Sequence, residues 1–126
     1  MKKSYLIVES EPAYANLLVS ALSQVGTLHV VDSAQAAIDW LDDPKHKADA
    51  IVTELLLGDR SGVEIIHELR SHYDWLDLPV IIHSRAYLDG DIARSDWRES
   101  YGVIAVIPKG VSALTKLKDA MTASRA

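Results

Sequence analysis

The sequence contains no cysteine among its 126 residues. This absence excludes disulfide bonds, thiolate metal sites and cysteine nucleophiles, so thiol redox chemistry is not available to the chain. Basic residues are also outnumbered, because 13 lysines and arginines stand against 18 aspartates and glutamates and give a formal charge of -5. We therefore expect no direct binding to nucleic acid and no electrostatic attachment to a membrane.

Long apolar runs and linker-like segments are missing as well. The apolar run from Tyr5 to Val8 is too short for a signal-peptide core, and no other run approaches the roughly 20 residues of a membrane-spanning helix. No repeat, low-complexity segment or Pro/Gly/Ser-rich linker divides the chain. With 48% hydrophobic and 25% charged residues, residues 1–126 are expected to form a single cytoplasmic domain with a substantial core.

Short β-rich runs alternate with amphipathic stretches along the chain. Such runs are typical of strands buried on both faces, and their alternation with helices favours right-handed βαβ crossovers. We predict a doubly wound α/β domain, flavodoxin-like, with a five-stranded parallel sheet in the order 2-1-3-4-5 and five helices. Pro108 cannot donate a ladder hydrogen bond and fits the end of an edge strand. The predicted strands are Ser4–Glu9, Leu28–Val31, Ala50–Glu54, Pro79–His83 and Val103–Ile107.

Apolar residues spaced by three and four mark the helices that cover this sheet. The first predicted helix carries an apolar stripe from Tyr14 to Val25 that includes Leu17. The third begins at a capping box, in which Ser61 and Glu64 satisfy each other's backbone N–H groups. The apolar faces of the third, fourth and fifth helices are predicted to be Val63, Ile66, Leu69 and Tyr73; Ile92, Ala93 and Trp97, within Asp89–Ser100; and Leu114, Leu117 and Met121.

Polar residues follow four of the five predicted strands, namely Glu9, Glu54, Ser84 and Lys109. Open α/β sheets bind ligands at the carboxyl ends of their strands, so we expect two carboxylates, a hydroxyl and an ammonium to converge there. Each residue alone has a structural explanation. An acid after a strand often caps a helix, Ser10 before a proline fits an N-cap, and a lysine can simply neutralise acids. Their joint placement indicates a site.

These motifs resemble the receiver domains of two-component response regulators. The chain has "VESEP" after the first strand, where that family has VDDDP, and "ELLLGDRSG" after the third, where it has DLxLPGxxG. Ser84 matches the family's Thr or Ser after the fourth strand, and Lys109 matches its lysine after the fifth. The resemblance covers nearly the whole chain. It implies phosphoryl transfer to one aspartate after the third strand, assisted by Mg²⁺ on neighbouring acids.

The chain departs from the family at the reacting position. Glu54 stands in place of the phosphoacceptor aspartate, and Glu9 and Ser10 stand in place of the acidic pair. Each glutamate is one methylene longer than aspartate, and a displacement of about 1 Å can cost roughly a hundredfold in rate. Glu9 and Glu54 still offer two carboxylates to a metal, so we expect no cofactor or weakly bound Mg²⁺, and little or no phosphorylation. Glu54 is also a candidate for partial imitation of a phosphorylated residue.

The family's conformational readout is altered too. Val106 stands where receivers usually have an aromatic residue, and Gly110 replaces the proline after Lys109. We expect a pseudo-receiver that is not an enzyme and binds other signalling proteins: a histidine kinase, an output domain or a regulator. The resemblance implies an interaction surface, and a homodimer contact, on the fourth helix, fifth strand and fifth helix. Its candidate residues are Arg94, Trp97, Arg98, Tyr101, Val111 and Lys116.

Three alternatives stay open at this stage. A divergent receiver still phosphorylated by its cognate histidine kinase would control an output protein. A flavin- or nucleotide-binding domain of the same architecture would need a Gly/Ser/Thr-rich loop after the first strand, where "ESEPAY" is acidic instead. A phosphohydrolase would need a well-placed aspartate pair, and Glu9 and Glu11 have the spacing but a different reach.

Overall fold

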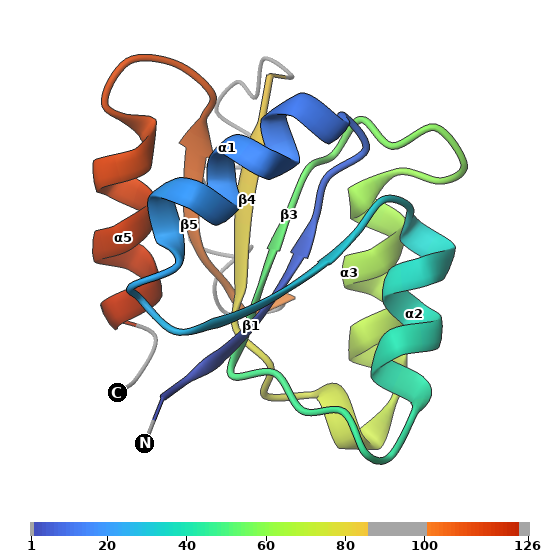
Figure 1. Cartoon of the computed structure of the whole chain (residues 1–126). Helices are drawn as coiled ribbons and strands as arrows, with labels where there is room; N and C mark the ends of the chain where they lie inside the picture. Colours follow the sequence, from blue (N-terminus) through green and yellow to red (C-terminus); the bar gives the residue numbers. More distant parts are fainter. Residues whose placement is uncertain (1, 86–100, 124–126) are drawn as a thin grey trace.

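The computed structural model describes residues 2–85 and 101–123. Five parallel strands form one sheet in the order β2-β1-β3-β4-β5, as the sequence predicts (Figure 1). β5 lies at one edge of the sheet and ends at Pro108, which is exposed. The strands are β1 (Ser4–Val8), β2 (Thr27–Val31), β3 (Ala50–Thr53), β4 (Val80–Ser84) and β5 (Val103–Pro108).

Helices cover both faces of the sheet (Figure 1). α1 (Pro12–Leu22) and α5 (Ala113–Ala123) pack on one face, whereas α2 (Ala34–Asp42) and α3 (Gly62–Ser71) pack on the other. Successive side chains of a strand point to opposite faces, so each strand contributes to two apolar cores. The helix predicted within Asp89–Ser100 lies outside the described residues. Within the described ranges, no helix is long and apolar enough to cross a membrane.

The alternation is clearest in β1. Tyr5 and Ile7 belong to the core under α1 and α5, and Leu6 and Val8 belong to the core under α2 and α3. All four side chains are at most 1% exposed. The apolar residues 5–8 of β1 are therefore buried on both faces of the sheet, between β2 and β3, and the acid that follows them, Glu9, is buried as well.

The predicted apolar stripe of the first helix is only partly correct. α1 ends at Leu22, so Val25 lies beyond it, and Leu17 is 48% exposed. The buried residues of α1 are Ala15, Leu18 and Leu22. These positions follow the helical period, and Leu17 lies one residue away from the stripe, on the solvent side of the helix.

The third helix differs from its prediction in two ways. α3 ends at Ser71 because His72 is extended. Tyr73 lies in a short 3₁₀ helix, η1 (Tyr73–Trp75), and is 89% exposed, so it does not belong to the apolar core as predicted. The capping box forms only by half. The Ser61 hydroxyl accepts the Glu64 N–H, but the Glu64 carboxylate accepts a hydrogen bond from the Arg60 guanidinium at 2.9 Å instead of the Ser61 backbone.

Arg70 holds the chain between α3 and β4 in place. Its guanidinium donates to the carbonyls of Trp75, Leu76 and Leu78 at 2.7–3.0 Å, and to the carbonyl of Tyr101 at 2.8 Å. It packs so closely on Gly102, which has a φ of 68°, that a Cβ there would lie 2.2 Å from a guanidinium nitrogen. One side chain thus joins η1 to the segment that enters β5.

We expect the Arg70→Met substitution to destabilise the domain by about 2–4 kcal/mol, because it leaves several partly buried carbonyls without their charged donor while keeping the aliphatic stem. The measurement is urea unfolding at neutral pH. Arg60→Met is the matched control and should cost clearly less, since the contacts of Arg60 among the described residues are surface ion pairs with Glu64 and Glu68. Equal losses in the two variants would contradict the role assigned to Arg70.

Candidate functional site

The carboxyl end of the sheet brings together the four polar residues singled out in the sequence. Glu9 and Glu54 directly follow β1 and β3, and their N–H groups donate to the carbonyls of Val31 and Val8 at 3.0 Å. Ser84 ends β4, and its carbonyl accepts the Lys109 N–H at 3.0 Å. These backbone hydrogen bonds continue the pattern of the sheet, so the backbone that carries each of the four side chains is held in place.

Both carboxylate oxygens of Glu54 are engaged. Oε2 accepts the N–H groups of Leu55 and Leu56 at 2.6 and 3.1 Å, and also the hydroxyl of Ser84. Oε1 forms an ion pair with Lys109 Nζ at 2.9 Å. The residue is 4% exposed. Its carboxylate therefore turns back over the start of the loop that follows β3, where four donors surround it.

These contacts shift the acidity of Glu54. Burial alone raises its pKa, but the hydrogen bonds from Ser84, the Leu56 N–H and Lys109, together with the charge of Lys109, outweigh burial and hold the pKa below its usual value of 4.5. Glu54 is consequently a carboxylate at neutral pH. Both oxygens of this carboxylate already have partners within the domain.

Lys109 supplies the positive charge of the site. Its Nζ lies 2.6 Å from Glu9 Oε1 and 2.9 Å from Glu54 Oε1, and its side chain is 4% exposed. The ring of Tyr14 covers the ammonium at 4.3 Å from the ring centroid, which adds a cation–π contact. Burial lowers the pKa of Lys109, but its bonds to the two glutamates dominate and raise it above 10.5. The ammonium therefore stays charged between the two acids.

A buried histidine and a partly buried tyrosine, neither of them predicted as a site residue, support this arrangement. His83 is 1% exposed, and its Nδ1 lies 2.7 Å from the carbonyl oxygen of Ile107. A carbonyl oxygen only accepts, so Nδ1 carries the proton and Nε2 accepts the hydroxyl of Tyr14 at 2.6 Å. Burial lowers the pKa of His83 and raises that of Tyr14, so both are neutral.

This pair fixes the position of the Tyr14 ring above Lys109. His83 thereby connects β4 to β5 and α1. The signal that was available is a histidine inside the otherwise aliphatic strand "VIIHS", since a buried polar group requires a partner. The identity of that partner depends on the packing of α1 and β5, which the local sequence does not specify.

The residues present do not fit a divalent cation well. Glu9 and Glu54 are the candidate ligands, but each already binds Lys109, and the remaining oxygen of Glu9 accepts the Glu11 N–H at 3.0 Å. Ser10 offers a hydroxyl instead of a carboxylate. It is not the helix cap either, because Glu11 occupies the N-cap of α1. Within residues 2–85 and 101–123, no three acidic or histidine side chains gather as a metal site would require.

The remaining candidates are dispersed. Val106 is partly buried and packs against the core under α2 and α3. Tyr101 is also partly buried and packs edge-on against the His67 ring at 5.2 Å. Val111 is 97% exposed and Lys116 is exposed. Arg94, Trp97 and Arg98 lie outside the described residues.

The geometry matches a known family. The chain fits the model of the response regulator receiver domain over residues 5–115, and it belongs to that family. No curated protein matches its sequence at a significant level.

Solved structures agree on the fold. A sensor protein from Polaromonas has a TM-score of 0.84 at 22% identity, over 98% of this chain and 96% of that one. The phosphorylated cyanobacterial phytochrome response regulator RcpA has a TM-score of 0.78 at 22% identity, over 98% and 91%. A Mn²⁺-bound response regulator has a TM-score of 0.76 at 20% identity, over 96% and 90%. At these identities the structures establish the shared fold.

The lowered pKa of Glu54 predicts how stability depends on pH. A carboxylate with a folded-state pKa below 4.5 stabilises the fold fully above that pH, and this contribution is lost as the pH falls through the folded-state pKa. We expect Glu54→Gln to unfold more easily than wild type at pH 7, and to lose less of its unfolding free energy on acidification below 4.5. Urea titrations across this range measure both effects.

Glu64→Gln is the control for that experiment. Glu64 is an exposed acid on α3 whose side chain forms a surface ion pair with Arg60 at 2.9 Å. The control variant should show the same acid-induced loss as wild type. If Glu54→Gln also loses stability in parallel with wild type, the buried ion pair does not contribute as described.

Proposed function

We propose that this receiver domain acts as a phosphorylation-independent interaction module in two-component signalling. The observation that carries the proposal is the complete engagement of Glu54, whose two oxygens accept from two backbone amides, a hydroxyl and an ammonium. The charged groups of the site are paired with one another, within the domain. We propose no catalytic activity for it.

Phosphoryl transfer to Glu54 faces three obstacles. A carboxylate oxygen must be free to attack phosphorus in line with the leaving group, and a cation must offset the developing charge. Oε2 of Glu54 already holds three donors, and Oε1 faces Lys109. The site also lacks a carboxylate at Ser10, and the two that it has are neutralised in part by a buried lysine instead of a metal.

The same contacts support partial imitation of a phosphorylated residue by Glu54. Hydroxyl, ammonium and amide N–H donors are the groups that a phosphoryl oxygen attracts. In this chain Ser84 and the amide of Leu56 donate hydrogen bonds to the glutamate, and Lys109 forms an ion pair with it. A glutamate brings one charge and two oxygens, whereas a phosphoryl group brings about -1.5 to -2 charges and three oxygens. The glutamate therefore carries less negative charge than a phosphoryl group, but unlike a phosphoryl group it is never removed.

We propose other signalling proteins as partners: a histidine kinase, an output domain or a regulator. The apolar Val111 is exposed in the turn before α5, and the cationic Lys116 is exposed on α5 itself, which supports a contact surface there. A homodimer through this side of the domain, together with Arg94, Trp97, Arg98 and Tyr101, is part of the proposal. The proposed location is cytoplasmic.

Intact-mass analysis after incubation with acetyl phosphate and Mg²⁺ tests the central claim. In a receiver, a carboxylate oxygen attacks phosphorus and acetate leaves, so the protein gains the mass of one phosphoryl group. We expect no such gain in the wild type. A phosphoryl adduct on wild-type Glu54 would instead support a divergent receiver that is still controlled by a histidine kinase.

The matched variants are Glu54→Asp alone and the combination of Glu9→Asp, Ser10→Asp and Glu54→Asp. The combination restores all three acids at aspartate length and should accept the phosphoryl group, which shows that the assay works on this fold. Reaction of Glu54→Asp alone would locate the loss in the extra methylene of Glu54. Its failure beside a reactive combination would locate part of the loss at Glu9 and Ser10.

Mg²⁺ binding supplies a separate test. Because Lys109 neutralises both candidate ligands, we expect wild-type amide resonances of Glu9, Ser10 and Glu54 to change little and without saturation in millimolar Mg²⁺. The combination variant should show saturable changes under the same conditions. Saturation of the wild type at low millimolar Mg²⁺ would contradict the assignment of Lys109 as the resident cation.

A further inference from the structure

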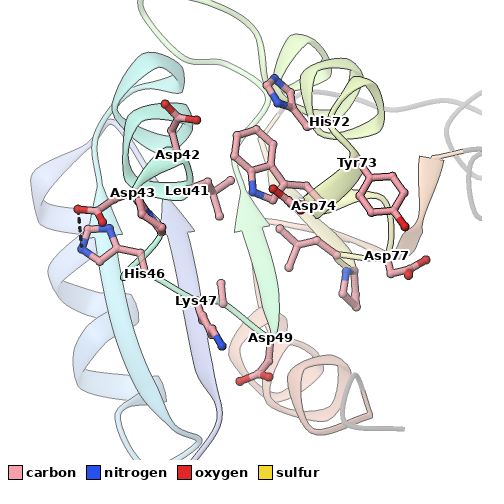
Figure 2. A pocket seen from close by; sticks show the side chains of 15 residues that line it. Leu41, Asp42, Asp43, His46, Lys47, Asp49, His72, Tyr73, Asp74 and Asp77 are labelled. Carbon is pink, nitrogen blue, oxygen red and sulfur yellow. Dashed lines mark ion pairs between the residues drawn. The ribbon is translucent and has the colours of Figure 1, made fainter.

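A groove of about 670 Å³ lies at the opposite end of the sheet from the acidic site (Figure 2). One wall consists of residues 41–44 and 46–49, which lead from α2 into β3. The other consists of residues 72–75 and 77–79, which lead from α3 through η1 into β4. The groove therefore borders the amino ends of two central strands, and nothing in the receiver site requires it.

Negative charge dominates both walls of the groove. Five aspartates face a single lysine, Lys47, across the two walls: Asp42, Asp43, Asp49, Asp74 and Asp77. Within the described part of the chain, no lysine or arginine forms an ion pair with any of these five. Asp43 and Asp49 are oriented by the N–H groups of Lys45 and Ser4 at 2.9 and 2.7 Å. His46 Nε2 lies 4.0 Å from an Asp43 oxygen, and Asp77 interacts electrostatically with Arg70. The groove therefore has more carboxylates than cations, although two of its aspartates have a nearby basic group.

Aromatic rings form the second feature of the groove, independent of its charge. Tyr73 is 89% exposed, which is unusual for so large a ring. On the same wall Trp75 packs on His72 at 4.3 Å, and on the facing wall His46 stacks at 4.4 Å and 13° on Trp40, which lies outside the groove. Aromatic faces beside carboxylates recognise planar or alkyl-ammonium cations, arginine above all.

The groove is also rigid on its η1 side. The Arg70 guanidinium binds the carbonyls of Trp75, Leu76 and Leu78 from behind, so the backbone of this wall is held before any ligand arrives. A preformed wall lowers the ordering cost of binding. Figure 2 shows Asp42 on one wall of the groove and Asp74 and Asp77 on the other.

We infer that this groove binds an extended basic segment of a partner protein, with arginine and lysine side chains spaced along it. Charge complementarity selects a cation, and the spread of the aspartates over two walls favours several cations on one chain over a single one. A metal ion is disfavoured, because no group of three ligating side chains forms among the described residues. Since the groove lies at the amino ends of the strands, this contact is separate from the proposed surface near α5.

Fluorescence anisotropy with a labelled peptide of alternating arginine and alanine tests the inference on the whole chain. We expect saturable binding that weakens as salt rises from about 0.02 to 0.2 M, because the Debye length falls over that range. A glutamate–alanine peptide of the same length should not bind. Absence of saturable binding of the basic peptide at low salt would overturn the inference.

Matched variants separate the groove from the general negative charge of the protein. The double variant Asp42→Asn with Asp74→Asn removes one exposed carboxylate from each wall and should weaken binding about tenfold or more. The double variant Asp39→Asn with Asp119→Asn removes the same charge from exposed positions outside the groove and should leave affinity within about twofold. Equal weakening by both variants would overturn the assignment to the groove.

Two further comparisons address the kind of ligand. Tyr73→Ala should weaken binding about threefold through loss of the exposed ring, with no change in unfolding free energy. Spermidine should compete only at concentrations far above those of the peptide, because it spans fewer of the aspartates. Competition by spermidine at equal concentration would overturn the protein-segment assignment in favour of a small polyamine.

Discussion

The buried ion group of Glu9, Lys109 and Glu54 is the constraint on which the carboxyl end of the sheet depends. Two carboxylates follow adjacent strands and are almost fully buried, so each requires a positive charge within the domain. Lys109 meets that requirement because β5 ends beside β4 and the Lys109 N–H is bonded to Ser84. The Tyr14 ring, held by His83, closes the remaining side. Removal of the ammonium would leave two facing acids without compensation.

The sequence was sufficient for the architecture and for the convergence of the polar residues. Apolar runs such as "YLIV" alternate with amphipathic stretches, and that pattern determines a parallel sheet with helices on both faces. The placement of Glu9, Glu54, Ser84 and Lys109 then follows from topology, because the ends of parallel strands meet at one edge. Helix ends were less predictable. Tyr73 fits the helical period of α3, but His72 is extended and ends the helix before it.

Contacts between distant segments could not be predicted from local pattern. The hydrogen bond from Tyr14 to His83 joins residues 69 positions apart, and the Arg70 contact with Tyr101 joins residues 31 apart. Neither partner choice is encoded by spacing within one element. The sequence likewise identifies Glu54 as an acid at the end of the third strand, but only the packing of side chains reveals that its two oxygens are both occupied.

The positive charge that pairs with Glu54 comes from Lys109, a residue of the same polypeptide, and this has a consequence for regulation in the cell. A site that depends on a phosphoryl donor and a divalent ion reports on kinases, phosphatases and metal supply. A site whose charges are balanced by Lys109 is complete when folding is complete. Under the function proposed here, the amount of signal would follow the number of molecules present, so that transcription, translation and proteolysis would set the strength of the output.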